Sequence, residues 1–505
     1  MSKKMKQNIL FIMSDQHRAD HMSCAGNSDV KTPNLDSLES QGLRFTNAFC
    51  ANPMCMPNRA TIFTGLYPNA HGVRSNGINL SADFPTFVDT LRGRGYITSS
   101  IGKLHLQFFT PPFKRKDKSA EAIFAWLNEK TAKSMRDNFP KPYYGLDHVE
   151  IVCGHGDVCT GHYTDWLEER APEYVEYIKE RFNDFFGVPF YETDMPEEVY
   201  NTTYVEERTI NFLEKYAKGD FGDKPFFLYC SFPDPHHPVC PPGKYKTMYP
   251  PNDITLPESF FHRDELKNHP YIGPAWRNPV FRGALLRYST EEEVRNFLAG
   301  TYGMISMMDH SIGKILASLK ALGLSENTIV IYTSDHGDFC GDHGMILKGP
   351  SPFNGILQVP MIWKVPGVTK PAITDALMSS IDIPTTILKL LGIRKRFFPP
   401  EMQGYDISPV LIDPNVEVRD SCLIEHDEDY RDHHLRLRHL VTKEYKITLY
   451  QNLEDYGDIY DRKNDPNELN NLWSKDKELR NKLIYKLCIE NMKAQSHLPQ
   501  RATLT

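Results

Sequence analysis

The sequence predicts an α/β protein with a large, mostly parallel β-sheet flanked by helices, followed by a smaller C-terminal α+β domain with an antiparallel sheet. Three observations support this prediction. Short apolar segments recur along the chain, segments with helical periodicity separate them, and beyond about residue 400 strand-like segments precede a final helix. We place the larger domain at residues 1–415 and the smaller one at residues 416–505.

Four apolar segments have the character of strands that are buried on both faces of a parallel sheet. They are continuous and rich in β-branched and aromatic residues. These segments are Asn8–Ser14, residues 96–102, residues 226–232 and Thr328–Ser334. Their alternation with helical segments indicates a sheet that is covered by helices on both faces.

Two helices are predicted with particular clarity. Residues 32–41 have Thr32 in the N-cap position, Pro33 in the first turn and Gly42 as the predicted stop. Residues 305–322 carry apolar side chains at helical spacing. That apolar stripe consists of Met308, Ile312, Ile315, Leu316 and Leu319. In the C-terminal part, residues 438–449 are strand-like and residues 475–492 are predicted to be a helix.

Composition excludes several classes of protein. With 40% hydrophobic and 24% charged residues, the 505-residue chain has the composition of a globular protein. The net charge of −7 disfavours nucleic acid or an anionic membrane as partner, because both attract basic surfaces. The ten cysteines form no CxxC pair, so we expect buried thiols rather than a zinc or disulfide framework.

The N-terminal segment is predicted to be a strand and not a leader. Its apolar run covers only residues 9–13, which is too short for the core of a signal peptide. No segment approaches the roughly 20 apolar residues of a spanning helix. The sequence as given therefore predicts a cytoplasmic protein.

Polar side chains follow each of the four predicted strands. In open α/β sheets, ligands bind at the carboxyl ends of the strands, so these side chains are candidates for one common site. They are Asp15, Gln16, Lys103, His105, His236, Asp335 and His336.

Two of these strand ends carry groups that bind metals. Asp15 with Gln16, and Asp335 with His336, would bring two carboxylates, an amide oxygen and an imidazole together if their strands are neighbours. The alternative is that these residues only cap the turns and helices that follow the strands.

Cys55 lies in the most specific segment of the chain. Pro57 follows two residues later and Arg59 four residues later, where a helix can begin. An anion at this point would meet free backbone N–H groups and a guanidinium. Residue 55 is thus placed to do chemistry on an anion, although a cysteine in such a loop can also be a small buried apolar residue.

At this point the chain resembles the sulfatase family, a branch of the alkaline phosphatase superfamily. The family signature is C-x-P-x-R followed by T-G, and Cys55, Pro57, Arg59, Thr64 and Gly65 match it. Further segments resemble family motifs in family order: Asp15, residues 102–105, residues 235–238, residues 333–337, Lys348 and residues 459–468.

The resemblance implies an alkaline-phosphatase-like sandwich fold and a hydrolase of sulfate monoesters, either aryl or carbohydrate sulfates. It also implies that a maturing enzyme oxidises Cys55 to formylglycine, whose hydrate is the nucleophile. By the same resemblance, one divalent metal would be held by Asp15, Gln16, Cys55, Asp335 and His336. Calcium is the expected ion, and magnesium or manganese are the alternatives; the nitrogen ligand His336 by itself suits manganese or zinc better than calcium.

Further roles follow from the resemblance. Lys103 and Lys348 would bind sulfate oxygens, and Arg59 would orient the formylglycine hydrate. His105 is the expected base that releases sulfate, and His236 the expected acid for the leaving oxygen, with Lys348 as its competitor. Asn76 is a substrate-binding candidate, although it can equally be a turn residue before Gly77.

The roles of three further groups of residues are less specific. His237 is expected to lie outside the innermost shell of the site. Residues 154–166 are rich in hydrogen-bonding and aromatic groups and are expected to shape the substrate pocket. The charged run 425–434 can either reach the site or form a solvated face.

Two rival functions also remain. Phosphonate monoester and phosphodiester hydrolases of the same superfamily share the Asp-Gln and Asp-His pairs, whereas Lys103 and His105 favour a sulfatase. A protein that binds metal or anions without catalysis, with Cys55 unmodified, belongs to another class. The natural substrate and the oligomeric state cannot be predicted from this sequence.

Overall fold

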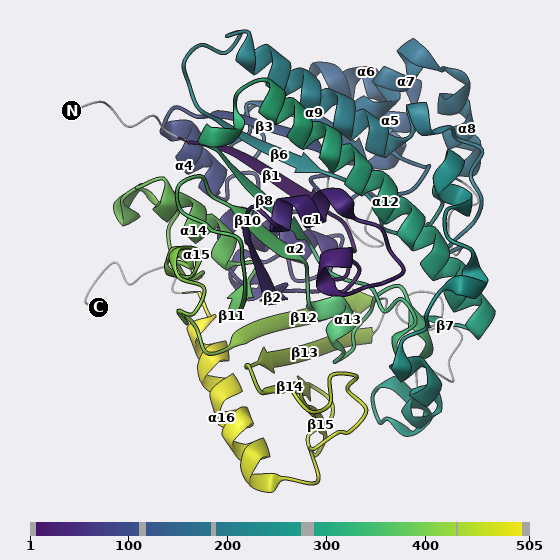
Figure 1. Ribbon diagram of the computed structural model, residues 1–505, viewed down its shortest axis with the longest axis vertical. Helices are drawn as coiled ribbons and strands as arrows, with labels where there is room; N and C mark the ends of the chain where they lie inside the picture. The colour runs from purple at the N-terminus through teal and green to yellow at the C-terminus, as the bar shows by residue number, and fades with distance from the viewer. Residues whose placement is uncertain (1–6, 111–117, 183–187, 274–286, 431–432, 497–505) are drawn as a thin grey trace.

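A computed structural model describes residues 7–110, 118–182, 188–273, 287–430 and 433–496. Its centre is a nine-stranded sheet with the order β11-β2-β10-β8-β1-β6-β3-β4-β5 (Figure 1). Helices cover both faces of this sheet, and a four-stranded antiparallel sheet follows in the C-terminal part. The predicted fold class is therefore confirmed.

The four predicted strands form the parallel centre of the large sheet. β1 (Asn8–Ser14) lies between β8 (Thr328–Ser334) and β6 (Phe226–Ser231), and β3 (Ile97–Gly102) pairs with β6. All of these pairings are parallel. The carboxyl ends of the four strands consequently lie at one edge of the sheet.

The remaining strands flank this centre. β2 (Leu43–Phe49) and β11 (Ala372–Ser379) run parallel to each other, whereas β10 (Met361–Lys364) is antiparallel to both of its neighbours. On the other side, β4 (His148–Cys153) is parallel to β3, and the short β5 (Thr160–Gly161) closes the sheet in the antiparallel sense. The sheet is thus mixed but mostly parallel.

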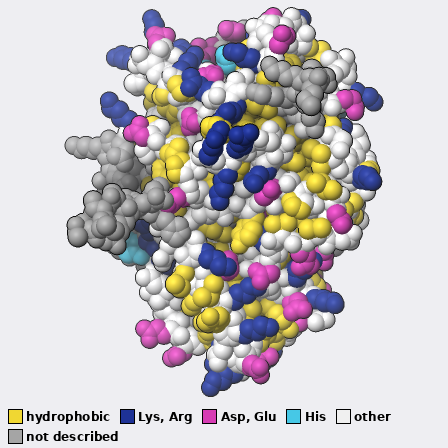
Figure 2. All heavy atoms as spheres, turned by 90° about the vertical axis from the view of Figure 1, so that its left-hand side faces the viewer, with side chains coloured by type: hydrophobic (Ala, Val, Ile, Leu, Met, Phe, Trp, Pro, Cys, Tyr) yellow, Lys and Arg dark blue, Asp and Glu magenta, His cyan; other side chains and the backbone are white. Residues whose placement is uncertain are grey.

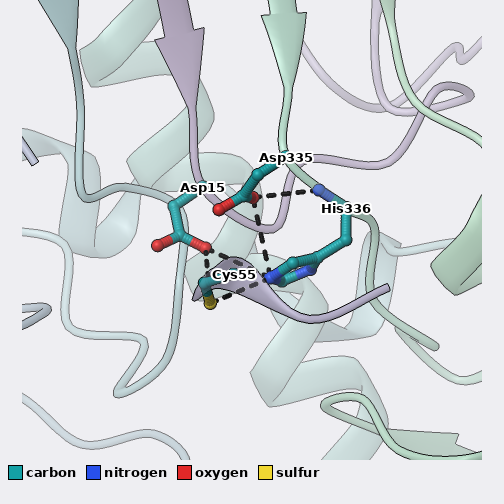
Figure 3. A group of neighbouring side chains, drawn as sticks. All are labelled: Asp15, Cys55, Asp335 and His336. Carbon is teal, nitrogen blue, oxygen red and sulfur yellow. Dashed lines mark hydrogen bonds and ion pairs between the residues drawn. The ribbon is translucent and has the colours of Figure 1, made fainter. Parts of the chain in front are cut away.

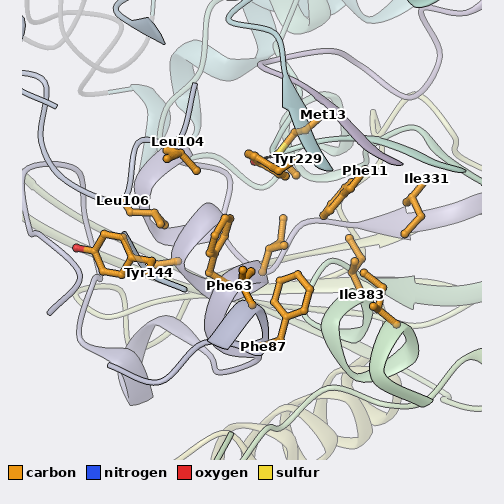
Figure 4. Close-up of a cluster of buried hydrophobic side chains, with 14 of the residues drawn as sticks. Phe11, Met13, Phe63, Phe87, Leu104, Leu106, Tyr144, Tyr229, Ile331 and Ile383 are labelled. Atoms are coloured by element: carbon orange, nitrogen blue, oxygen red, sulfur yellow. Dashed lines mark hydrogen bonds between the residues drawn. The ribbon is translucent and has the colours of Figure 1, made fainter. Parts of the chain in front are cut away.

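Alternate residues of β1 contribute to two separate cores, which explains why the strand is apolar throughout. Phe11 and Met13 pack on one face with Phe63 and Phe87, from α2 (Cys55–Thr64) and α4 (Phe87–Gly93), and with Ile383 of α14 (Asp382–Leu390) (Figure 4). On the opposite face, Leu10 and Ile12 pack against α1 (Pro33–Glu39), α9 (Asn201–Ala217) and α12 (Glu291–Ala321). All these apolar side chains are buried.

α1 spans Pro33–Glu39, within the predicted range, with Thr32 as its N-cap residue and Pro33 in its first turn, as predicted; the predicted stop was wrong. The hydroxyl of Thr32 caps no helical N–H group and instead donates to the Asp36 carboxylate at 3.2 Å. Gly42 does not stop the helix, since Ser40 is the C-cap. A Cβ atom on Gly42 would lie 2.5 Å from the Trp363 carbonyl oxygen, so the close approach of β10 accounts for this glycine.

α12 spans Glu291–Ala321 and begins well before the predicted residue 305. A capping box between Thr290 and Glu293 starts it: each side chain accepts a hydrogen bond from the backbone N–H of the other residue. This T-x-x-E pattern is visible in the sequence and would have located the true start. Met308, Ile312 and Ile315 face the sheet, as the predicted apolar stripe requires.

The C-terminal sheet consists of β12 (Cys422–Tyr430), β13 (His433–Val441), β14 (Tyr445–Tyr450) and β15 (Gly457–Asp461). The strand-like segment 438–449 is therefore a hairpin of two strands rather than one strand. α16 (Lys477–Lys493) packs on this sheet, close to the predicted range. The proposed domain boundary after residue 415 remains a prediction.

Other expectations concern the whole chain. All ten cysteines are free thiols and eight of them are buried, as predicted. Among the helices in the described ranges, none has both the length and the apolar character needed to cross a bilayer. Basic and acidic side chains are interspersed with apolar ones on the face shown in Figure 2, in keeping with the modest net charge of −7.

Candidate active site

The ends of β1 and β8 bring the predicted metal-binding residues together (Figure 3). Ser14 and Ser334 are paired in register, so the residues after them, Asp15 and Asp335, lie side by side. His336 Nε2 is 3.5 Å from Asp15 Oδ1 and 3.6 Å from Asp335 Oδ1. All three side chains are fully buried.

Cys55 is the first residue of α2 and points into the same group. Its Sγ is 3.1 Å from His336 Nε2, 3.7 Å from Asp15 Oδ1 and 3.0 Å from Lys348 Nζ. Asn58, one turn along the helix, donates from its amide to the Asp335 carbonyl oxygen at 2.6 Å and thereby holds α2 against the end of β8.

The surroundings of Cys55 favour its anionic form. Burial raises the pKa of the Cys55 thiol, but the neighbouring cations Lys103 and Lys348 outweigh burial, and the pKa lies below its usual value. Cys50 provides the contrast, since burial raises the pKa of its thiol well above the usual value. Of these two buried cysteines, only Cys55 lies in an electropositive environment.

Arg59 ties the helix to the strand ends. Its guanidinium is fully buried and donates from Nε to Asp335 Oδ2 at 2.7 Å. Nη1 donates to the Lys103 carbonyl oxygen at 2.8 Å and to Ser231 Oγ at 3.0 Å. Among the described residues Nη2 has no hydrogen-bond partner, although it lies 3.8 Å from Asp15 Oδ2. One N–H direction of Arg59 is thus left for a ligand in the site.

Two lysines flank Cys55. Lys103 Nζ forms an ion pair with Asp15 and lies 2.6 Å from His155 Nε2. Lys348 Nζ lies 2.9 Å from both His236 Nε2 and His336 Nε2. Burial acts to raise the pKa of Asp15, but Lys103 and the other nearby cations hold it far below its usual value. An anion near Cys55 would therefore meet two ammonium groups.

His105 lies at the end of β3 with its ring stacked on Phe109, at a centroid distance of 3.8 Å. Burial and the charge of Lys103 lower the pKa of His105 well below its usual value, so the imidazole is neutral and can accept a proton. Its backbone N–H donates to Glu121 Oε2 at 2.6 Å, in a turn where His105 has φ 55°. This supporting role of Glu121 was not predicted from the sequence.

His236 belongs to a stack of three imidazole rings. The ring centroids of His155 and His236 are 3.6 Å apart, and those of His236 and His237 are 4.1 Å apart. His236 Nδ1 lies 2.5 Å from the His237 carbonyl oxygen, which can only accept, so Nδ1 carries the proton and Nε2 is the acceptor that faces Lys348. His155 was not predicted as a site residue, although the segment that contains it was expected to shape the pocket.

Gln16 is buried next to the carboxylates through its backbone, whose N–H donates to Asp335 Oδ1 at 3.1 Å. Its Nε2 donates to Asp338 Oδ2 at 2.5 Å and lies 3.0 Å from His237 Nδ1. Its Oε1 is buried and has no hydrogen-bond partner among the described residues. Such an oxygen, on the residue that follows Asp15, needs a partner, and a cation would supply one.

The donor set itself fits a divalent metal. Asp15 and Asp335 offer carboxylate oxygens, Gln16 an amide oxygen and His336 an imidazole nitrogen. Oxygen ligands predominate, as hard cations such as calcium or magnesium prefer, while the imidazole also suits manganese. The ligand types in this site are therefore suited to a divalent metal ion.

The structure places Asn76 beside the start of α2. Asn76 Oδ1 accepts a hydrogen bond from the Met56 backbone N–H at 3.2 Å, which satisfies one of the free donors of this helix end. Its contact with substrate stays a prediction.

Part of the charged run 425–434 is not a solvated face, because Glu425, Asp427 and Glu428 are buried. Glu425 accepts from the Asn69 backbone N–H at 2.8 Å.

Comparison with known proteins finds similar sequences over nearly the whole chain. A family model described as "Sulfatase" matches residues 7–393, and one described as "N-sulphoglucosamine sulphohydrolase, C-terminal" matches residues 341–495. An ulvan-active sulfatase of Formosa agariphila is 28% identical over 95% of this chain and 80% of its own. An arylsulfatase of Clostridium perfringens is 29% identical over 93% of this chain and 90% of its own.

Among solved structures, the phosphonate monoester hydrolase of Agrobacterium radiobacter superposes with a TM-score of 0.76. It is 24% identical and covers 99% of this chain and 98% of its own. At this identity the likeness concerns the fold, which sulfatases and phosphonate hydrolases share.

Proposed function

The chain belongs to the sulfatase family and is a sulfuric ester hydrolase, and from this premise we propose that it hydrolyses aryl or carbohydrate sulfate monoesters with a formylglycine made from Cys55. The observation that best supports this proposal is the position of Cys55. It lies at a helix N-terminus, 3.0 Å from Lys348 Nζ and beside the group of carboxylates and imidazole described above.

A divalent cation, for which we propose calcium with magnesium or manganese as alternatives, would be held by Asp15, Gln16, Asp335 and His336 and would act as a Lewis acid. The side chains of the chain supply the rest of the chemistry. Lys103 and Lys348 bind and orient the sulfate oxygens, so that sulfur faces residue 55 in line with the leaving oxygen. Arg59 uses its remaining N–H direction to orient the oxygen nucleophile at residue 55.

Proton transfer involves two histidines and one lysine. His105, neutral and buried, is our proposed base for sulfate release. For the leaving oxygen, the tautomer of His236 favours Lys348 over His236 as proton donor. His236 Nε2 already accepts from Lys348 Nζ at 2.9 Å, so His236 orients the ammonium, which gives one of its other protons to the leaving oxygen.

Turnover of paired substrates tests the proposed reaction. We expect kcat/KM for an aryl sulfate to exceed that for the matching aryl phosphonate monoester, because Lys103 and His105 suit sulfate transfer. A strong preference for the phosphonate would instead establish the rival reaction. Turnover of neither substrate class, with sulfate still bound, would support a protein that binds anions without catalysis.

Mass spectrometry of the peptide that contains Cys55 tests the maturation step. We propose that a formylglycine-generating enzyme of the host acts on Cys55, as the C-x-P-x-R segment suggests. Protein from the native host should show the mass decrease that accompanies replacement of a thiol by an aldehyde. A peptide with an intact thiol, isolated from fully active enzyme, would contradict the formylglycine proposal.

Removal of the metal should lower stability as well as activity. Without the cation, the Gln16 amide oxygen and two carboxylates remain buried and incompletely compensated. Binding at about 100 times Kd stabilises a folded protein by about 2.7 kcal/mol. We therefore expect a chelator to lower the midpoint of thermal unfolding, and calcium to restore it.

A matched pair of variants shows whether Asp335, one of the proposed ligands, binds the ion. In Asp335→Asn the calcium-dependent shift of the midpoint should shrink or vanish. In Asp458→Asn, which alters a buried carboxylate of the C-terminal sheet, stability should fall while the calcium-dependent shift persists. Equal shifts in both variants would place the ion elsewhere.

A further inference from the structure

His155 has no part in the reaction described above, yet it lies within the site. It belongs to the turn that follows β4, and its Nε2 is 2.6 Å from Lys103 Nζ and 3.7 Å from Asp15 Oδ2. Its ring stacks on that of His236 with an interplanar angle of 15°. One imidazole therefore contacts both the proposed sulfate-binding lysine and the histidine that faces Lys348.

The turn around His155 is held rigidly. Gly154 has φ 114° and Gly156 has φ 54°, which are conformations that favour glycine. A Cβ atom on Gly156 would lie 2.8 Å from the Pro238 carbonyl oxygen, so the turn packs directly on the segment that carries His236. Asn201 Nδ2 also donates to the Gly156 carbonyl oxygen at 2.8 Å.

Asp157, which follows Gly156, also holds the turn in place. Its buried carboxylate accepts three hydroxyl hydrogen bonds, from Tyr177 at 2.7 Å, Tyr191 at 2.5 Å and Thr193 at 2.6 Å. So many constraints on a short turn indicate that the position of the His155 ring matters.

The chemistry of the contact defines what His155 does. An ammonium can only donate, so His155 Nε2 accepts from Lys103 and the ring is neutral. Lys103 Nζ has three N–H groups, of which one reaches Asp15 and one reaches His155, and the third is left for a sulfate oxygen. A carboxylate in place of His155 would cancel the charge of the lysine, whereas a neutral acceptor fixes its direction and leaves its charge intact.

We propose that His155 is a positioning residue, which holds the Lys103 ammonium in the direction that binds the sulfate group. This inference rests on the proposed function. It goes beyond it because it assigns a specific task to the turn between β4 and β5.

Two substitutions separate this role from simple packing. His155→Phe keeps an aromatic ring to stack on His236 but removes the acceptor, whereas His155→Gln supplies an acceptor without the ring. A hydrogen bond to a charged group contributes about 1.5–3 kcal/mol, or a factor of about 10 to 100. We expect His155→Phe to lower kcat/KM for an aryl sulfate by that factor, and to weaken inhibition by inorganic sulfate by the same factor. His155→Gln should recover most of the lost kcat/KM and most of the lost sulfate inhibition.

Controls make each outcome decisive. His162→Phe alters another imidazole of the same region, which accepts a hydrogen bond from the Ile151 backbone N–H at 3.1 Å. This variant should change stability without changing inhibition by sulfate. Unchanged sulfate inhibition in His155→Phe, or equal losses in the Phe and Gln variants, would overturn the proposal. If His155→Phe does not fold, His155→Ala compared with His155→Gln gives the same test. An inactive wild type would refute the proposed function instead.

Discussion

Replacement of Cys55 by alanine is expected to abolish hydrolysis of sulfate esters, with kcat reduced by at least about a thousandfold. No other described side chain in the site carries an oxygen or sulfur nucleophile at the start of a helix between Lys103 and Lys348. The fold should survive, because Cys55 is small and its sulfur makes polar rather than packing contacts. Steady-state kinetics and thermal unfolding of the same preparation test both statements.

The matched control for this prediction is Cys50→Ala. Cys50 is also fully buried, five positions earlier in the chain. Within the described ranges, its Sγ has one hydrogen-bond acceptor, the Ile356 carbonyl oxygen at 3.7 Å. This variant should lose some stability and keep its kcat. If Cys55→Ala retained the wild-type kcat, or if both variants lost activity equally, residue 55 would not be the nucleophile.

The convergence of Asp15 and Asp335 could be predicted on one condition, that their strands are neighbours in the sheet. Both residues come directly after continuous apolar strands, and neighbouring parallel strands end at the same edge. The relation of Cys55 to Arg59 was equally accessible, since residues four apart lie on one face of a helix. These features depend on local sequence and on one simple rule of sheet architecture.

His155 could not be found in this way. β4, the strand that leads to it, is exposed at His148 and only half-buried at Val149 and Glu150, because just the two-residue β5 lies beyond it. It therefore lacks the continuous apolar signature that revealed the four central strands. Glu121 was hidden for a related reason, since it supports His105 from a separate loop without any motif of its own.

Arg59→Ala should cause the largest combined loss of stability and activity. The guanidinium and the Asp335 carboxylate form a fully buried ion pair, with Nε 2.7 Å from Oδ2. Removal of one partner leaves an uncompensated buried charge, which costs about 3–5 kcal/mol of stability. Because Asp335 is also a proposed metal ligand, kcat should fall together with the midpoint of thermal unfolding. Arg59→Lys keeps the charge but loses the second donor arm of the guanidinium. Its kcat and its midpoint of thermal unfolding should lie between those of the wild type and those of Arg59→Ala.

The pair Arg92–Asp147 offers a control of the same geometry, since its Nε–Oδ1 distance is also 2.7 Å. Its side chains are 46% and 35% exposed, so solvent screens the charges and Arg92→Ala should cost no more than about 1 kcal/mol. Burial is the variable that separates the two ion pairs. Equal stability losses in Arg59→Ala and Arg92→Ala would mean that Asp335 finds another partner when Arg59 is absent. Wild-type turnover by Arg59→Ala would in addition exclude this guanidinium from the chemistry at residue 55.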